Sequence, residues 1–307
     1  MSKTIHILGA GSLGLLWAAR LTQAGIPCKL ILRNGQALQY WQKTDRLTLE
    51  KQDLTASFKV TAEQATSSDE PIRTLIVATK AWAVKDALDS LDARLKADTR
   101  FLLLQNGLGS QQFVSARFPD QQVLCASVTD GAWKRSANHV VWAGAGQTLI
   151  GNLTKQPAPR WLNRLDIAGI NWCWEPQMLD VLWQKLAINC VINPVTALYD
   201  CLNGEVAKHL GTSMAPLIGE LHALLTNQGI DVSQTALTTR IEEVIRNTAN
   251  NSSSMRQDIH AGRRTEIDFI LGYACRAARQ AGLSTPHLEQ LYHQLQRRLS
   301  ELNLPTH

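Results

Sequence analysis

The chain has 307 residues, of which 45% are hydrophobic and 19% charged, a balance typical of a globular protein rather than a disordered one. At about 150 residues per domain, this length suggests two domains. The net charge of +5 is scattered, with no long basic run, so nucleic-acid binding is not expected. There is no stretch of roughly 18 apolar residues that could span a membrane, and the six cysteines form no C-x-x-C pair. We therefore expect a cytoplasmic protein with reduced thiols.

The N-terminal half alternates predicted strands with predicted helices. A strand over residues 4–8, a helix over 15–24 and a strand over 28–32 form a β-turn-α-β unit. This alternation predicts an α/β fold, a mostly parallel, doubly wound sheet of the Rossmann type. Residues 137–143 and 148–150 are predicted to finish the sheet as antiparallel hairpins. The remaining predicted strands are 75–79, 101–105 and 123–128, and the remaining helices are 81–95 and 110–117.

The C-terminal half is predicted to be all-helical. A helix begins at Met178 and runs to Ile192, and Pro194 is expected to stop it. We place the domain boundary between residues 175 and 176, which gives a Rossmann-type domain (1–175) and a helical domain (176–307). The other predicted helices are 211–228, 233–247, 265–281 and 286–302.

A glycine-rich loop, Gly9-Ala10-Gly11-Ser12-Leu13-Gly14, follows the first strand and opens the first helix. The first glycine permits a tight turn, the second a close approach of the backbone to a pyrophosphate, and the third close packing of helix on strand. The N-terminal N–H groups of the helix would receive the phosphates. Its position within a βαβ unit favours dinucleotide binding over a turn that binds nothing.

The choice of dinucleotide is indicated at the end of the second strand. An acidic residue there would bind the ribose diol of NAD, whereas this chain has Arg33. A guanidinium suits a 2′-phosphate, so NADP(H) is favoured over NAD. The alternative is an ordinary solvated arginine.

Two further polar residues, Lys80 and Asn106, follow the next predicted strands. The carboxyl ends of parallel strands share one edge of the sheet, where ligands of open α/β sheets bind. Both side chains are thus expected to reach cofactor and substrate. A surface lysine and a helix-capping asparagine are the alternatives.

A polar face runs along the long helix of the second half. Lys185, Asn189 and Asn193 recur every four residues in an otherwise apolar helix. Asparagine lowers helix propensity, which favours a defined hydrogen-bonding role over a merely solvated or inter-domain face. A partly desolvated lysine there could polarise and protonate a developing alkoxide.

The segments 251–258 and 263–268 form a second polar cluster. Its serines either cap a helix, with Gln257 as capping-box partner of Ser254, or receive a substrate carboxylate. Glu266 stands at the start of another helix, where a carboxylate is favourable on dipole grounds alone. The chain has no H-E-x-x-H or Cys/His set for a metal and no G-x-S-x-G.

Taken together, these segments resemble the 2-dehydropantoate 2-reductase (ketopantoate reductase) family. The resemblance covers essentially the whole chain in family order. The match departs from the family pattern at Ala83 and at Thr129–Gly131. The segments of this chain that carry the resemblance are 8–14, 80–82, 106–109, 182–194, 203–205, 253–259 and 265–268.

This resemblance implies NADPH-dependent reduction of 2-dehydropantoate to (R)-pantoate, on the route to pantothenate and coenzyme A. It implies Lys185 as proton donor, Arg33 and Lys80 at the phosphate end of the cofactor, and Glu266 in contact with cofactor or substrate. It places Ala132 beside the cofactor and Asn106 near the nicotinamide. The implied substrate-binding residues are Asn106, Asn189, Asn193, Asn203 and Ser254.

The expected partner is therefore a small keto acid, and binding to nucleic acid or to a membrane is not expected. The protein is expected to be a monomer or a homodimer. Two rival hypotheses stay open. One is an NADP-linked reductase of another branched keto acid or a polyol phosphate. The other is a dinucleotide sensor without catalysis, which would have no use for a lysine on an asparagine-flanked helix.

Overall fold

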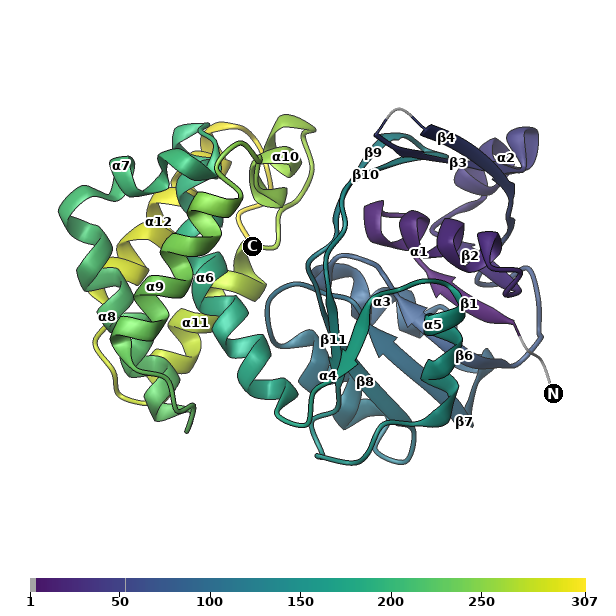
Figure 1. Ribbon diagram of the computed structural model, residues 1–307, viewed down its shortest axis with the longest axis horizontal. Coiled ribbons are helices and arrows are strands. Elements are labelled where there is room, and N and C mark those ends of the chain that lie inside the picture. Colours follow the sequence, from purple (N-terminus) through teal and green to yellow (C-terminus); the bar gives the residue numbers. More distant parts are fainter. Residues whose placement is uncertain (1–3, 53) are drawn as a thin grey trace. The chain divides into compact units, whose positions relative to one another are not determined.

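The computed structural model describes residues 4–52 and 54–307, which divide into two compact units (Figure 1). The first comprises the chain up to Gln105 together with Ser110–Leu179. The second comprises Asn106–Gly109 and Asp180–His307. The first is a mixed α/β unit and the second is helical, which confirms the predicted fold class.

The main sheet of the first unit, within the described residues, has eight strands in the order β12-β11-β8-β7-β6-β1-β2-β5. Neighbouring strands are parallel throughout except for the antiparallel pair β11–β8. The order β5-β2-β1-β6-β7-β8 is that of a dinucleotide-binding sheet, whose direction of winding changes between β1 and β6. The strands are β1 (Ile5–Leu8), β2 (Cys28–Leu32), β5 (Thr61–Gln64), β6 (Ile72–Val77), β7 (Leu95–Leu103), β8 (Gln122–Val128), β11 (Thr148–Gly151) and β12 (Trp172–Trp174).

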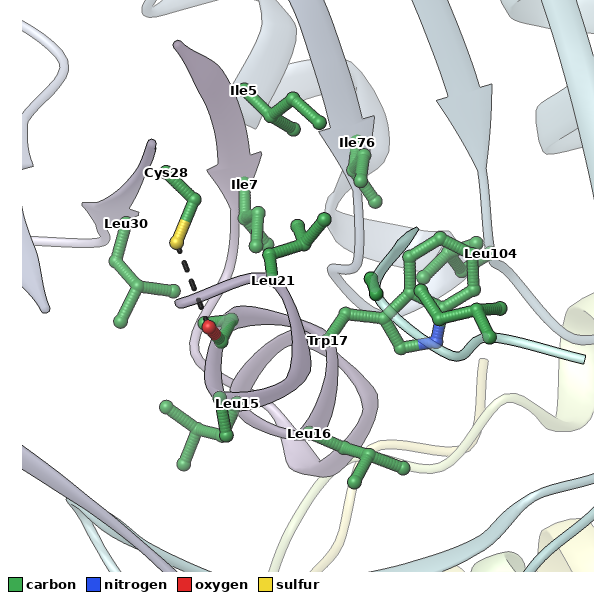
Figure 2. Close-up of a cluster of buried hydrophobic side chains, with 14 of the residues drawn as sticks. Ile5, Ile7, Leu15, Leu16, Trp17, Leu21, Cys28, Leu30, Ile76 and Leu104 are labelled. Carbon is green, nitrogen blue, oxygen red and sulfur yellow. Dashed lines mark hydrogen bonds between the residues drawn. The ribbon is translucent and has the colours of Figure 1, made fainter. Parts of the chain in front are cut away.

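Helix α1 (Ser12–Gln23) packs its apolar side on one face of this sheet (Figure 2). Trp17 and Leu21 are completely buried and lie with Ile7 and Ile76 in one cluster. A buried side chain of this size contributes about 1.5–3 kcal/mol of hydrophobic free energy. The cluster therefore fixes the helix, and with it the loop that precedes the helix.

The opposite face of β1 carries His6, which is completely buried. Burial lowers the pKa of His6 to about 4, although the nearby carboxylate of Glu63 acts in the other direction. The imidazole is therefore neutral at pH 7. His6 is therefore an uncharged residue of the sheet interior.

A second, four-stranded sheet, absent from the sequence-based prediction, has the order β4-β3-β10-β9 and packs against α1 (Figure 1). Residues 137–143 were expected to extend the main sheet, which was wrong: β10 pairs with β9 and β3 instead. The small sheet buries Leu47, Leu49 and Val140 in the same core as α1, and this long-range packing has no local sequence signal. Its strands are β3 (Arg46–Lys51), β4 (Leu54–Lys59), β9 (Gly131–Ser136) and β10 (His139–Gly144).

The helical unit centres on α6 (Met178–Tyr199), which continues past Pro194. The expected stop at this proline was wrong. Proline removes one N–H from the helix, but Val195 and Thr196 are completely buried, and this packing holds the last turns. Around α6 lie α7 (Val206–Leu210), α8 (Met214–Asn227), α9 (Gln234–Asn247), α10 (Ser254–His260), α11 (Ile267–Gln280) and α12 (Pro286–Glu301).

The remaining helices of the first unit agree only in part with the prediction. Residues 81–95, predicted as one helix, form a 3-10 turn (Ala81–Ala83), α3 (Val84–Asp89) and a second 3-10 turn (Asp92–Arg94). Helix α4 (Ser110–Arg117) matches its prediction. Helices α2 (Gly35–Thr44) and α5 (Asn163–Ile167) were not predicted.

Candidate functional site

The strand ends of the main sheet are aligned by backbone hydrogen bonds at one edge. Three loop residues donate their N–H groups to the end of the neighbouring strand. The pairs are Gly9 N–Ile31 O (3.1 Å), Ala78 N–Leu8 O (2.9 Å) and Leu104 N–Val77 O (3.0 Å). The glycine loop, Arg33 and Lys80 therefore lie at the carboxyl edge, beside the change of winding where such sheets bind ligands.

The fold requires glycine at two of the three glycine positions of the loop. Gly9 has φ +104°, and a Cβ on Gly14 would lie 2.1 Å from the carbonyl oxygen of Gly9. These two positions therefore require glycine for folding. Gly11 has φ −74°, and a Cβ there would make only an ordinary contact at 3.5 Å. The described neighbours of Gly11 do not themselves require glycine, so the backbone at position 11 is open to close approach by a ligand.

Helix α1 begins within this glycine motif, at Ser12. Gly11 is its N-cap and carries no side chain to accept a hydrogen bond from the first turn. The first N–H groups of a helix lack intrahelical partners and attract anions. The loop, with Ala10, Ser12 and Leu13 around the helix start, thus fits the pyrophosphate of a dinucleotide.

Arg33 and Lys80 lie beside this loop as predicted. Arg33 is exposed directly after β2, and the next residue, Asn34, caps α2 by accepting from the N–H of Ala37 at 2.9 Å. Lys80 is partly exposed and precedes the 3-10 turn after β6. Arg33 thus has no capping role, and its charge is available at the end of β2.

Sequence reasoning missed a group of residues between β8 and β10. The side chain of Asp130 is 2% exposed, and its Oδ1 lies 3.7 Å from Nη1 of Arg20 on α1. The same oxygen accepts from Trp142 Nε1 (3.0 Å) and from the N–H of Gly146 (3.1 Å). Asp130 belongs to the segment that departs from the family pattern, and its carboxylate connects α1, β10 and the chain at Gly146.

Ala132, two residues further on, lies on β9. It is partly buried and packs against the core beneath α1. From the same strand, Lys134 donates its Nζ hydrogen to the carbonyl oxygen of Ala10 at 2.9 Å. The β9 strand therefore contacts the glycine loop directly.

The tetrapeptide Asn106–Gly109 packs with the helical unit, although it follows β7 in the sequence. Leu108 donates its N–H to the carbonyl oxygen of Phe269 at 2.9 Å. A Cβ on Gly107, whose φ is +76°, would lie 2.2 Å from that oxygen. This close approach holds Gly107 and Leu108 against α11, with Asn106 directly before them in the chain.

The polar face of α6 is present as predicted. Lys185 and Asn189 are partly exposed, and Asn193 is buried. Burial of the ammonium lowers the pKa of Lys185 to about 8, while the negative charge of Glu266 partly offsets this effect. Glu266 is buried and immediately precedes α11. The structure thus places a lysine of lowered pKa on one helix, followed by two amides at intervals of four residues, with the carboxylate of Glu266 near enough to act on its charge.

Asn203 and the serine segment lie in the same unit. Asn203 is buried, and its Nδ2 donates to Thr248 Oγ1 at 3.0 Å, whereas its Oδ1 has no hydrogen-bond partner among the described residues. The helix cap is Ser253, which accepts from the N–H of Arg256 at 3.1 Å, rather than Ser254. Ser254 is exposed at the first position of α10, so its hydroxyl is not used for capping.

The predicted site residues thus divide between the two units. The dinucleotide-type features lie in the first, and the groups suited to proton transfer lie in the second. Within the described residues there is no cluster of His, Cys, Asp and Glu that would hold a metal ion. No described helix has the length and apolar character needed to cross a membrane.

Comparisons with known proteins agree with this architecture. The family model "Ketopantoate reductase PanE/ApbA" matches residues 5–155, and its C-terminal counterpart matches 177–298. A 2-dehydropantoate 2-reductase of Vibrio cholerae is 33% identical over 299 residues, 95% of this chain and 96% of the relative. The corresponding protein of Salmonella typhi is 32% identical, covering 97% of this chain and 95% of the relative.

Solved structures show the same fold. A PanE/ApbA family ketopantoate reductase from Ralstonia eutropha has a TM-score of 0.88 at 23% identity, covering 98% of this chain and 99% of its own. A ternary structure of D-mandelate dehydrogenase with NADH and anilino(oxo)acetate has a TM-score of 0.89 at 22% identity, covering 98% and 100%. Because both family models match in order and the relatives align over nearly the full length, this chain belongs to the ketopantoate reductase PanE/ApbA family.

Proposed function

We propose that this protein reduces 2-dehydropantoate to (R)-pantoate with NADPH. The observation that carries the proposal is the partly buried Lys185, with its lowered pKa, on the asparagine face of α6. The curated relatives named 2-dehydropantoate 2-reductase support the choice of substrate. A sensor that only binds a dinucleotide has no need of such a lysine.

The residues of the first unit fit a dinucleotide. The loop of Gly9–Gly14 would hold the pyrophosphate at the start of α1. Arg33 would bind the 2′-phosphate that distinguishes NADPH from NADH, because a guanidinium forms paired hydrogen bonds with phosphate oxygens. Lys80 would bind the same phosphate end, with Ala132 and Asn106 further along the cofactor.

When bound, the dihydronicotinamide supplies a hydride to the C2 carbonyl carbon of the substrate. The protein must then stabilise the charge that develops on the carbonyl oxygen. Lys185, as an ammonium, would donate a hydrogen bond to this oxygen and then deliver its proton. Asn106, Asn189, Asn193, Asn203 and Ser254 would orient the carboxylate and hydroxyl ends of the substrate.

This role requires Lys185 to be protonated in the free enzyme. With a pKa of about 8, the ammonium form predominates below pH 8 and is lost above it. The kcat/KM for reduction should therefore fall as the pH rises through 8.

Glu266→Gln should move this alkaline limb to lower pH. The carboxylate of Glu266 raises the pKa of Lys185, so its removal lowers that pKa further. We expect the apparent pKa of the pH–rate profile to fall, with the change largest near pH 8. A profile of unchanged midpoint would show that Glu266 does not tune Lys185, and Glu243→Gln, on an exposed site of α9, serves as the control.

The direct test is oxidation of NADPH, followed at about 340 nm, with 2-dehydropantoate and with competing branched keto acids. Turnover with 2-dehydropantoate in preference to the others is expected. Tight NADPH binding without turnover on any keto acid would instead support the sensor hypothesis.

Arg33→Ala tests the choice of cofactor. We expect the KM for NADPH to rise about tenfold or more, because a charge-assisted contact to phosphate is lost. The KM for NADH, which lacks the 2′-phosphate, should stay the same and is the internal control. Equal rates with NADH and NADPH in the unaltered protein would contradict the assignment.

We place this activity in the cytoplasm, acting as a monomer or homodimer. The free cysteines, five of six buried, suit a reducing compartment. A dimeric ketopantoate reductase from Staphylococcus aureus has the same fold, with a TM-score of 0.81.

A further inference from the structure

The strand β9 presents a lysine to the glycine loop. In the register of β9 with β10, Lys134 lies opposite Val140 and Ala132 opposite Trp142. Directly paired residues of an antiparallel ladder share one face of the sheet. Val140 is completely buried in the core with α1, so Lys134 belongs to the face of the small sheet that is turned toward α1.

The ammonium reaches the loop itself. Lys134 Nζ lies 2.9 Å from the carbonyl oxygen of Ala10, between the two glycines that precede α1. Its side chain is nevertheless exposed. A positive charge thus stands beside the helix end whose N–H groups already favour anions.

The base of this strand is held rigidly. Asp130, which immediately precedes β9, forms the buried pair with Arg20 of α1. The guanidinium of Arg20 also lies over the ring of Trp142, 4.5 Å from its centroid. The position of β9 relative to α1, and with it that of Lys134, is therefore fixed by buried contacts.

We propose that Lys134 is a further cofactor-binding residue, which binds the pyrophosphate of the nicotinamide dinucleotide beside the glycine loop. This inference rests on the proposed function, since it presumes that the loop receives a dinucleotide. The pyrophosphate is common to NADPH and NADH, whereas the 2′-phosphate, assigned to Arg33, is not.

The test is the dissociation constant of NADPH and of NADH, measured by titration calorimetry without substrate. Lys134→Ala and Lys134→Gln should each raise both constants about tenfold, the loss expected for one charge-assisted contact at an exposed position. Lys134→Arg keeps the positive charge and should bind within about threefold of the unaltered protein. The affinity of Lys134→Ala should also fall less steeply with added salt, because one ionic contact is missing.

The matched control is Arg135→Ala. Arg135 is the next residue of the strand, carries the same charge, and forms an ion pair with Glu50 at 2.7 Å. Its removal should leave both constants unchanged, although it lowers the net charge equally. Thermal melting of every variant shows whether the fold is kept.

Three outcomes would overturn the inference. Unchanged binding of both dinucleotides by Lys134→Ala would remove Lys134 from the site. A loss for NADPH alone would assign the lysine to the 2′-phosphate. Normal binding by Lys134→Gln would mean that a neutral donor to Ala10 suffices. If the unaltered protein bound neither dinucleotide, the proposed function itself would fail.

Discussion

Replacing Lys185 with alanine is expected to lower kcat for reduction of 2-dehydropantoate by a factor of about 10²–10⁴, the usual contribution of a positioned general acid. The affinity for NADPH should stay unchanged, because the glycine loop and Arg33 belong to the other unit. Steady-state kinetics and calorimetric titration with NADPH measure the two quantities separately. Hydride transfer to a carbonyl leaves charge on the oxygen, and without the ammonium only water or the amides can stabilise it.

Gln184→Ala provides the control for this experiment. Gln184 is adjacent on α6, and its side chain accepts a hydrogen bond from Arg240. Its loss should leave kcat nearly unchanged. A Lys185→Ala enzyme that kept most of its kcat would exclude this lysine as proton donor and direct attention to another acid or to water.

Asp130→Ala is expected to have the largest effect on stability, lowering the free energy of unfolding by about 3 kcal/mol. The substitution leaves the guanidinium of Arg20 buried without its carboxylate partner, and the N–H groups of Trp142 and Gly146 without their acceptor. For a unit of this size, the melting temperature should fall by about 6–12 °C. Calorimetry or circular dichroism during thermal unfolding measures the change.

A double-mutant cycle isolates the pair. Arg20→Met removes the other charge, and the double variant Arg20→Met/Asp130→Ala should be more stable than the sum of the single effects indicates. An additive cycle would mean that the two side chains do not interact. Lys59→Ala, at an exposed ion pair with Asp45, should shift the melting temperature little, as surface pairs contribute little.

Features that depend on local chain geometry were predictable from the sequence. The glycine loop, the strand at Cys28–Leu32 and the helix at Ser110–Arg117 have short-range signals in turn residues and apolar periodicity. The polar face of α6 was predicted because a spacing of four defines a helix face. Its extension past Pro194 was not, since buried packing rather than local propensity maintains those turns.

Features that depend on distant partners were not predictable. The small sheet joins β3 to β10, which are far apart in the sequence, and neither strand has a strong pattern of its own. In the candidate site, the buried role of Asp130 depends on Arg20, and the position of Lys134 depends on Ala10. Sequence spacing carries no information on contacts between such distant residues. The contacts of Asp130 and Lys134 could therefore be identified only in the structure.

The packing of Asn106–Gly109 with α11 makes the helical unit discontinuous in sequence. Leu108 is completely buried, and the carbonyl of Phe269 takes its hydrogen bond from this tetrapeptide. A fragment cut at the start of α6 would lack Leu108, which leaves an apolar hollow and removes one hydrogen bond to α11. During synthesis the tetrapeptide leaves the ribosome well before α11 does. Its contacts with α11 can therefore form only after most of the helical unit has been synthesised. The helical half is therefore not a module that recombination could transfer to another protein without also transferring four residues from the middle of the first half.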